Sequence, residues 1–198
     1  MDVLQLLTDI DLVIFDLGGV LYNIDFERTR TALAALPGYN GEAIAFGVDV
    51  QDDAFVRVDR GEISDEAFYR QLRQRFGFTC SDADIESAWC AILIGPFADA
   101  VEWITSVRAQ RPVVLLSNIS YPHLRHALPH MQPILEHVEH AFYSCEIGLR
   151  KPDPHAFLHV TSTMGVTPTR TLLIDDSSAN CAAATELGMR VWQVTREA

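Results

Sequence analysis

The sequence predicts an α/β protein in which helices cover both faces of a parallel β-sheet and a small α-helical domain interrupts the chain after the first strand. Two observations lead to this fold class. In the second half of the chain, short continuous runs of branched and aromatic residues alternate with segments of helical period, as expected for strands buried on both faces. Between the first such run and Pro96, about 70 residues contain several helical segments and no comparable strand.

Five runs are expected to form the strands of the sheet. Apolar residues at helical intervals precede the second, fourth and fifth of them, so strand and helix alternate in a βαβ series. Such a series implies a Rossmann-like, doubly wound parallel sheet. The five predicted strands are residues 12–15, 113–116, 141–145, 172–174 and 191–194.

Three helices are expected in the inserted domain. The first covers residues 26–36, and the second covers residues 64–76 with Ser64 as its N-cap. The third covers residues 81–93 and begins with Ser-x-x-Asp, a pattern close to a capping box. The predicted domains are an α/β core of residues 1–21 and 94–198 and a helical domain of residues 22–93.

The charge balance argues against partners that are themselves polyanions. Fifteen Lys and Arg residues stand against 27 Asp and Glu residues, a formal net charge of -12. This balance disfavours long-range attraction to nucleic acid or to an anionic membrane surface. A small anionic substrate is compatible with it if a metal ion or a few basic groups neutralise the substrate locally.

The cysteines and the N-terminus favour a cytoplasmic protein. The four cysteines form no C-x-x-C pair and have no histidines at zinc-like spacing, so we expect reduced, mostly buried thiols. The chain begins with no basic region and no small-residue cleavage site, and no apolar run approaches the roughly 20 residues of a membrane span. The sequence leaves open whether the protein is a monomer or a homodimer.

Polar side chains stand at the predicted carboxyl ends of the strands, where open parallel sheets gather their functional groups. The first strand ends at Asp16, and Gly18 and Gly19 then let the chain turn sharply and bring backbone groups close to a ligand. The later strand ends, and the link after the third strand, carry the other candidates: Ser117 and Asn118, Arg150 and Lys151, and Asp175 and Asp176.

This set of groups favours phosphoryl transfer. Three clustered carboxylates repel one another unless a cation lies between them, and hard oxygen ligands suit Mg²⁺, which usually shares the phosphate of its substrate. A lysine and a serine supply positive charge and a hydrogen-bond donor for a transferring phosphoryl group. Since a carboxylate is a known nucleophile, we expect transfer from a phosphate monoester to Asp16 and then to water.

Four motifs follow one another along nearly the whole chain: FDLGGV at 15–20, LSN at 116–118, GLRKPDP at 148–154 and IDDS at 174–177. This set resembles the haloacid dehalogenase superfamily, in its branch with a helical cap after the first strand. The stretches NIDFERTR and RGEISDEAF, together with GLRKPDP, are also similar to the subgroup that includes bacterial phosphatases acting on α-glucose 1-phosphate.

The resemblance implies a nucleophile, a phosphate-binding pair and a metal site. Asp16 is then the nucleophile, and Ser117 and Lys151 complete the catalytic set by binding the phosphate. Asp175 is either a metal ligand or an acid beside one. The expected Mg²⁺ ligands are Asp16, Asp175 and Asp176, with the backbone carbonyl of Gly18.

Three further residues are expected to contact the substrate. Asn118 faces it by the resemblance, and Gly19 brings its backbone close to it. His123 follows Ser117 by about six residues, close enough on chain reach to border the same pocket.

Gly18 departs from the family pattern. Most phosphatases of the superfamily have Asp at this position, where it protonates the leaving oxygen and then activates water, work that contributes about 10²–10⁴-fold. Three interpretations are open: Asp25, His123 or a substrate-bound water transfers the proton; the substrate has a better leaving group, as a sugar 1-phosphate has; or hydrolysis has been lost. The similar sugar-phosphatase subgroup carries the same Asp-Leu-Gly pattern, which favours retained activity.

The leading hypothesis is therefore a Mg²⁺-dependent phosphatase of small phosphorylated metabolites, sugar phosphates first. The alternatives are a non-catalytic binding or regulatory protein, a phosphotransferase and a haloacid dehalogenase. Dehalogenases of the superfamily resemble a pattern with an aromatic residue two places after the nucleophile and no paired acids in the fourth motif, unlike Gly18 and Asp175-Asp176 here. The intact acids and Lys151 argue against a pure binding protein.

Overall fold

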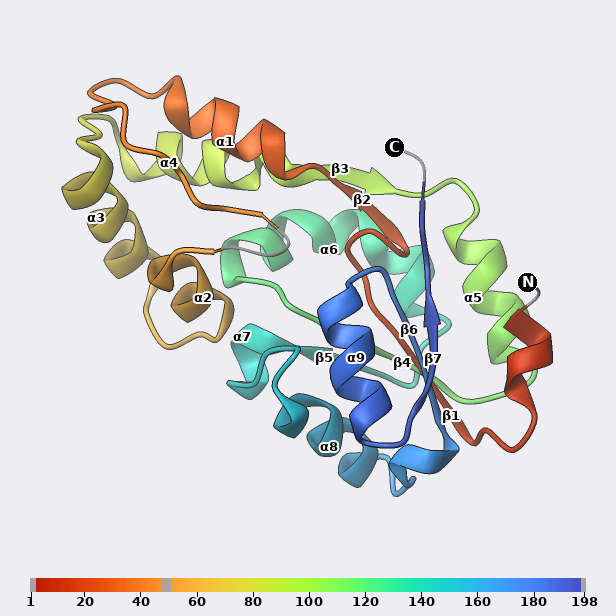
Figure 1. Ribbon diagram of the computed structural model, residues 1–198. Helices are drawn as coiled ribbons and strands as arrows, with labels where there is room; N and C mark the ends of the chain where they lie inside the picture. Colours follow the sequence, from red (N-terminus) through yellow and green to blue (C-terminus); the bar gives the residue numbers. More distant parts are fainter. Residues whose placement is uncertain (1–2, 48–50, 197–198) are drawn as a thin grey trace.

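A computed structural model describes residues 3–47 and 51–196, and it contains the five-stranded parallel sheet that the sequence predicts. The strands are β1 (Leu12–Phe15), β4 (Val113–Ser117), β5 (His140–Tyr143), β6 (Thr171–Asp175) and β7 (Arg190–Gln193). Their order is β5-β4-β1-β6-β7, and all neighbours are parallel. β1 is central (Figure 1), so the chain builds one half of the sheet through β5 and then returns to the other side of β1.

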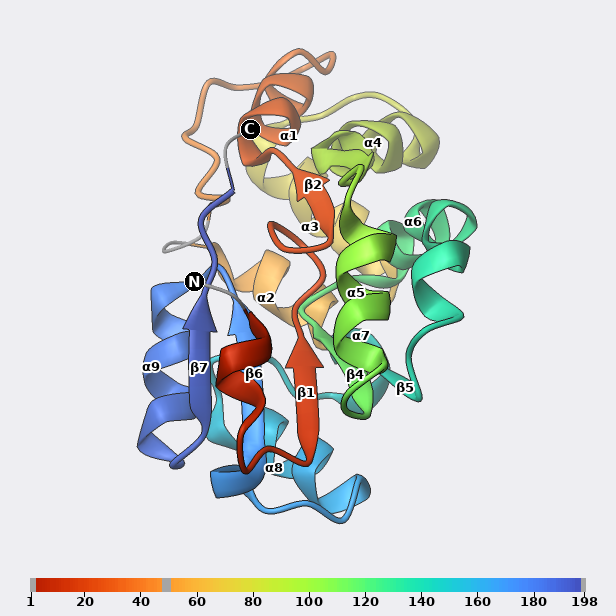
Figure 2. The same ribbon diagram turned by 90° about the vertical axis from the view of Figure 1, so that its right-hand side faces the viewer.

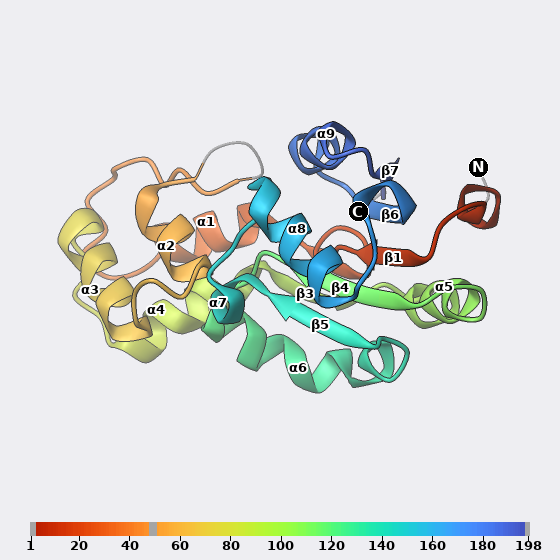
Figure 3. The same ribbon diagram turned by 90° about the horizontal axis from the view of Figure 1, so that it is seen from below.

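Helices cover both faces of the sheet (Figure 3). They are α5 (Ala100–Arg108) and α6 (Tyr121–Leu135) on one face, and α8 (Pro154–Thr163) and α9 (Ser178–Glu186) on the other. Two 3₁₀ helices, η1 (Val3–Leu7) and η3 (Pro168–Arg170), precede β1 and β6. Along β1, Val13 and Phe15 belong to the apolar core shared with α5 and α6, whereas Ile14 belongs to the core shared with α8 and α9. The alternation confirms the doubly wound fold, because each face of a buried strand packs on its own helix layer.

The predicted third strand is wrong at its C-terminal end. β5 ends at Tyr143, and α7 (Ser144–Ile147) begins where the sequence predicts continued strand. Ser144 is fully buried, and its hydroxyl donates to the carbonyl of Asp59 at 2.6 Å and accepts from the backbone N–H of Ile119 at 2.8 Å. These tertiary hydrogen bonds fix the first residue of α7 in place and override the strand propensity of the apolar run.

The inserted segment is helical, as predicted. It contains α1 (Phe26–Ala34), α2 (Asp53–Asp59), α3 (Asp65–Phe76), α4 (Asp82–Trp89) and the 3₁₀ helix η2 (Cys90–Ile92). The Ser64 side chain caps α3 by accepting from the backbone N–H of Ala67, and Ser81 and Asp84 form a complete capping box at α4. The predicted third helix therefore starts correctly and ends early, because the chain tightens into η2 after Trp89.

A two-stranded antiparallel sheet, which the sequence pattern does not reveal, lies at the base of the insert. It pairs β2 (Tyr22–Ile24) with β3 (Leu93–Pro96). Both strands are too short for a period to show, and β3 contains Gly95 and Pro96, residues that weaken a strand assignment. The division of the chain at residues 22 and 93 stays a prediction, with this ribbon at both ends of the insert.

Trp89, the last residue of α4, joins the insert to the α/β core. The insert lies above the carboxyl ends of the strands (Figure 2). The Trp89 indole is fully buried, stacks 4.4 Å from the ring of His123 on α6, and donates from Nε1 to the Ser120 hydroxyl at 3.1 Å. On its insert side it stacks on Phe55 at 5.1 Å. Trp89 thus connects the apolar core of the insert to α6, and Ile24 and Leu93 also pack against both that core and the core of the α/β domain.

The described residues also bear on the cysteine and membrane expectations. No cysteine is in a disulfide, and Cys90, Cys145 and Cys181 are buried, which confirms mostly buried free thiols. Within residues 3–47 and 51–196, no helix combines the length and apolar character that crossing a bilayer requires.

Replacing Trp89 tests this connection. Trp89→Ala is expected to lower the free energy of unfolding by about 3–5 kcal/mol, and Trp89→Phe, which leaves the Ser120 hydroxyl without its partner, by about 1–3 kcal/mol. Urea unfolding followed by circular dichroism measures both. In a Ser120→Ala background the Trp89→Phe cost should shrink; an unchanged cost in that background would show that the hydrogen bond contributes nothing.

Candidate active site

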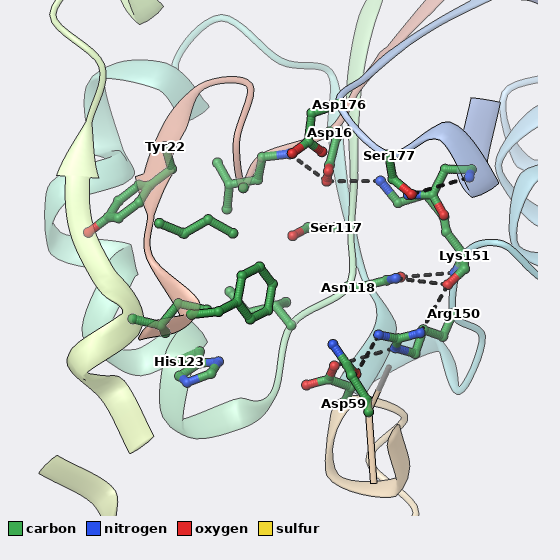
Figure 4. A pocket seen from close by; sticks show the side chains of 18 of the residues that line it. Asp16, Tyr22, Asp59, Ser117, Asn118, His123, Arg150, Lys151, Asp176 and Ser177 are labelled. Atoms are coloured by element: carbon green, nitrogen blue, oxygen red, sulfur yellow. Dashed lines mark hydrogen bonds and ion pairs between the residues drawn. The ribbon is translucent and has the colours of Figure 1, made fainter. Parts of the chain in front are cut away.

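Most of the predicted site residues meet in one cavity of about 160 Å³ at the carboxyl edge of the sheet, beneath the insert (Figure 4). Asp16 follows β1, Ser117 ends β4, and Asp176 follows β6, so neighbouring strands bring them together. The predicted residues that line the cavity are Asp16, Gly18, Ser117, Asn118, His123, Lys151 and Asp176. Gly19 and Asp175 lie behind its wall.

Lys151 is the buried cation of the site. Its Nζ lies 2.8 Å from Asp16 Oδ1 and 2.7 Å from Asp175 Oδ2, and its side chain is 1% exposed. Burial opposes the charge of the ammonium group, but the two carboxylates outweigh that effect and raise the pKa of Lys151. The lysine is therefore a fixed positive charge beside Asp16.

Asn118 holds the backbone of Lys151 in place. Its amide donates to the Lys151 carbonyl at 2.8 Å and accepts from the Lys151 N–H at 2.9 Å. This pair of hydrogen bonds ties the loop after α7 to the end of β4. Asn118 lines the cavity, so its contact with the substrate stays a prediction, but the structure adds a positioning role that the sequence does not indicate.

Asp175 is saturated by protein donors. Its Oδ1 accepts from the backbone N–H of Ser177 at 2.9 Å and from Asn180 Nδ2 at 3.0 Å, while Oδ2 accepts from Lys151 at 2.7 Å. Since the residue has no exposed surface, its carboxylate mainly orients Lys151. Asp16, in contrast, makes both its contacts through Oδ1, and its Oδ2 has no hydrogen bond to a described residue.

The carboxylates fit a divalent cation. Asp16, Asp175 and Asp176 each offer an oxygen, and the three oxygens lie within 4.8 Å of one another. Burial, with the nearby charges of the other two acids, raises the pKa of Asp16 to about 7, although Lys151 opposes this shift. One lysine thus does not balance three acids, and a hard cation bound to oxygen ligands such as Mg²⁺ would supply the missing charge.

Gly19 shapes this carboxylate cluster. Its φ is +75°, and a Cβ added there would lie 2.2 Å from Asp176 Oδ2. Only glycine permits both this backbone conformation and this close approach. Gly19 is not among the cavity residues and lies against Asp176, so its contact with the substrate stays a prediction.

The position that a side chain at Gly18 would take lies against the tip of Ile24. A Cβ added at Gly18 would lie 2.9 Å from Ile24 Cδ1, and Ile24 belongs to β2 at the base of the insert. Asp25, one of the suggested replacements, accepts from the backbone N–H of Glu27 at 2.8 Å as the N-cap of α1 and is not among the cavity residues. The structure therefore gives no support to Asp25 as the proton donor.

His123 lies at the opposite end of the cavity from Asp16 and Asp176 (Figure 4). Its Nε2 is 3.0 Å from the carbonyl of Trp89, and because a carbonyl only accepts, Nε2 carries the proton. Burial lowers the pKa of His123 to about 4, so the ring is neutral. A neutral imidazole at the opposite end of the cavity from the nucleophile is not placed to act as the missing acid, and its contact with the substrate stays a prediction.

Asp59, on the insert, is a cavity residue that the sequence analysis does not identify. It ends α2, is 6% exposed, and lies 3.4 Å through Oδ2 from Arg150 Nε. Burial raises its pKa to about 6, against the effect of Arg150. In the sequence the nearest indication of a special position is a glycine two residues later, Gly61. The structure explains this glycine, because an added Cβ there would lie 2.3 Å from the carbonyl oxygen of Cys145.

Apolar side chains form the wall between these two ends. They come from β2, β3, α1, the loop before α2, and the loop after β4. The large members are Tyr22, Ile24, Phe26, Phe46, Ile92, Leu93 and Ile119.

Comparison with known proteins gives consistent matches along the chain. A family model described as haloacid dehalogenase-like hydrolase matches residues 10–188. A D-ribitol-5-phosphate phosphatase from Bacteroides thetaiotaomicron is 25% identical over 186 residues, with 91% of this chain and 90% of that protein covered. A sesquiterpene phosphatase from Aspergillus oryzae is 26% identical over 178 residues, covering 89% and 85%.

A solved structure resembles the whole fold. It is the crystal structure of a haloacid dehalogenase family enzyme from Bacteroides thetaiotaomicron in complex with magnesium and inorganic phosphate. The two chains are 30% identical, 93% of each is covered, and the TM-score is 0.80.

Gly19→Ala tests the carboxylate site without replacing any of its carboxylates. The added methyl group collides with Asp176, so Mg²⁺ affinity measured by calorimetry should fall by about 10- to 100-fold. Gly165→Ala is the matched control, because Gly165 has a φ of +67° and open space around its Cβ position. Both variants should lose about 1–2 kcal/mol of stability from backbone strain. Equal Mg²⁺ affinity in the two would contradict the assignment of Asp176 to the metal site.

Proposed function

The chain belongs to the haloacid dehalogenase-like hydrolase family, and on this premise we propose that it is a Mg²⁺-dependent phosphatase of small phosphate monoesters, sugar phosphates above all. The observation that carries the proposal is the buried Lys151 between Asp16 and Asp175, next to a third acid. A phosphoryl group is the ligand that such a combination of one fixed cation and an oxygen-rich metal site suits best.

Asp16 is the nucleophile in this proposal. Its unbonded Oδ2 attacks phosphorus, the new O–P bond forms as the ester O–P bond breaks, and the leaving group departs with the electron pair as an alkoxide that takes a proton from water. Water then attacks the phosphorus of the aspartyl-phosphate and gives up a proton to the solvent, which releases inorganic phosphate and restores the Asp16 carboxylate. Lys151 and the Ser117 hydroxyl, which has no hydrogen bond to a described residue, bind the phosphate oxygens.

Mg²⁺ would be held by Asp16, Asp176 and the Gly18 carbonyl, with Asp175 behind them. When bound, the ion neutralises charge on the transferring phosphoryl group. The protein residues do the remaining work: Asn118 fixes the position of Lys151, and Asp175 keeps its ammonium group directed at Asp16.

The leaving group is the specific part of the proposal. Because residue 18 is glycine and Asp176 is assigned to Mg²⁺, the described cavity offers no free carboxyl group next to Asp16 to protonate the leaving oxygen. An anomeric oxygen, as in α-glucose 1-phosphate, departs more readily than a primary alcohol and needs this help least. The D-ribitol-5-phosphate phosphatase relative supports a polyol phosphate instead, although the leaving oxygen of that substrate is a primary alcohol and does not share this advantage.

The competing functions fit the site less well. A haloacid dehalogenase has no use for the cluster of three acids around a lysine, and a binding protein has no use for a free Asp16 Oδ2 beside a fixed cation. A phosphotransferase would need a group to activate its acceptor, which the space at Gly18 does not provide.

Asp16→Asn tests the nucleophile. The substitution should lower kcat/KM by about 10³-fold or more. Native protein without Mg²⁺ should be inactive as well. Phosphate release from α-glucose 1-phosphate, D-ribitol 5-phosphate and 4-nitrophenyl phosphate measures this. Asp11→Asn is the control, since Asp11 pairs with Arg170 on the surface before β1 and away from the cavity. Turnover that survives in Asp16→Asn would refute the mechanism.

A second experiment restores the missing acid. In the double variant Gly18→Asp with Ile24→Ala, the new carboxylate has room beside the nucleophile. Rates on substrates with poor leaving groups should then rise toward the 10²–10⁴-fold that general acids typically contribute. Gly18→Asp alone should gain less because Ile24 obstructs it. The measurement is the dependence of kcat/KM on leaving-group pKa across a series of aryl phosphates. This dependence should be steep in the native protein and shallower in the double variant. A flat dependence in the native protein would mean that an acid already protonates the leaving group.

A further inference from the structure

We infer that the end of the cavity farthest from Asp16 is a hydroxyl-binding subsite, in which His123 Nδ1 and Asp59 Oδ1 accept hydrogen bonds from the leaving group. The subsite selects uncharged, polyhydroxylated leaving groups over both hydrocarbon and anionic ones. This inference rests on the proposed phosphatase function and specifies its substrate class.

His123 presents a fixed acceptor to the cavity. The Trp89 carbonyl accepts from its Nε2–H at 3.0 Å, so Nδ1 is unprotonated and can only accept. The ring is 6% exposed, is held by stacking on Trp89 at 4.4 Å, and Nδ1 has no hydrogen bond to a described residue. Nδ1 is not among the enclosed side-chain atoms that lack a partner, so it is open to the cavity, where a ligand hydroxyl can donate to it.

Asp59 presents a second acceptor. Arg150 Nε contacts only Oδ2, at 3.4 Å, and Oδ1 has no hydrogen bond to a described residue. Asp59 is 6% exposed and lines the cavity from the insert side. At neutral pH the carboxylate is mostly ionised, given its pKa of about 6, so Oδ1 also only accepts.

The only guanidinium among the described cavity residues is engaged elsewhere. Arg150 donates from Nη2 to Gln51 Oε1 at 2.7 Å and from Nη1 to the Lys151 carbonyl at 3.3 Å, besides its contact with Asp59. A carboxylate or second phosphate on the leaving group would therefore meet Asp59 without a free cation to receive it. A hydrocarbon leaving group would leave both acceptors without partners, which a site built for hydroxyl groups rejects strongly.

The apolar wall is compatible with a polyol. Phe26 and Phe46 lie edge to face, with ring centroids 5.0 Å apart, and both line the cavity. Aromatic faces can pack on the C–H surface of a sugar or polyol while its hydroxyl groups reach the acceptors at the end. The cavity thus separates phosphate binding, apolar packing and hydroxyl recognition along its length (Figure 4).

Two variants remove the acceptors, the isosteric Asp59→Asn and His123→Gln. In Asp59→Asn, Arg150 should keep the amide oxygen at the Oδ2 position, so an NH₂ donor replaces Oδ1. In His123→Gln, the amide NH₂ can keep the hydrogen bond to the Trp89 carbonyl while the Nδ1 acceptor is lost. Glu86→Gln is the matched control: Glu86 contacts Arg125 across the same junction of insert and core, at 3.2 Å, but does not line the cavity.

The readout is selectivity, measured as kcat/KM on α-glucose 1-phosphate and D-ribitol 5-phosphate against 4-nitrophenyl phosphate. Each acceptor variant should lose about 10- to 100-fold on the polyol phosphates and less than about threefold on 4-nitrophenyl phosphate. The loss should appear mainly in KM, and Glu86→Gln should change neither substrate. Native protein should also prefer the polyol phosphates to farnesyl phosphate and to 3-phosphoglycerate.

Equal losses on all substrates would overturn the inference and leave the phosphatase function standing, because they would mean that Asp59 and His123 act only through the structure. If native protein releases phosphate from no substrate, the proposed function fails instead. Calorimetry of D-ribitol 5-phosphate and phenyl phosphate binding to native protein with Mg²⁺ then tests the subsite by itself. Tighter binding of D-ribitol 5-phosphate that is lost in Asp59→Asn supports the subsite. Equal binding of the two compounds overturns it.

Discussion

The ion pairs of Lys151 with Asp16 and Asp175 are the constraint on which the rest of the site depends. A fully buried ammonium group is tolerated only when carboxylates surround it, and those acids come from two adjacent strands, β1 and β6. Asn118 adds the end of β4 by holding the lysine backbone. Three strand ends are thereby fixed around one charge, and the negative charge left over makes the site a place for a cation and a phosphate.

The insert completes the cavity rather than merely covering it. Trp89 packs on His123 and directs the histidine proton through its own carbonyl, so the contact that anchors the insert also sets the tautomer of a cavity residue. The tip of the Ile24 side chain lies against the position that a side chain at residue 18 would take. The same inserted segment therefore borders both the end of the cavity that holds Asp16 and the end that holds His123 and Asp59.

The sequence predicts the sheet, its helix layers and the group of residues at the strand ends, because parallel strands place their carboxyl ends on one edge. It does not predict contacts made across the insert. Asp59 stands between the predicted helices of residues 26–36 and 64–76, and nothing along the chain shows that it ends a further helix or that Arg150 pairs with it. Ile24 reads as an ordinary apolar residue, and the β2–β3 ribbon is too short to show a period. These features exist only once the insert is packed on the core.

The most direct test of the central claim is to trap the covalent intermediate. Native protein mixed with Mg²⁺ and α-glucose 1-phosphate is quenched in acid within the first turnover, and peptide mass spectrometry then locates any added phosphoryl group. A phosphoryl group on the peptide that carries Asp16, absent without Mg²⁺, is the result that the arrangement of Lys151, Asp16 and Asp176 predicts. Rapid phosphate release with no phosphoryl group on Asp16 at any quench time would contradict it.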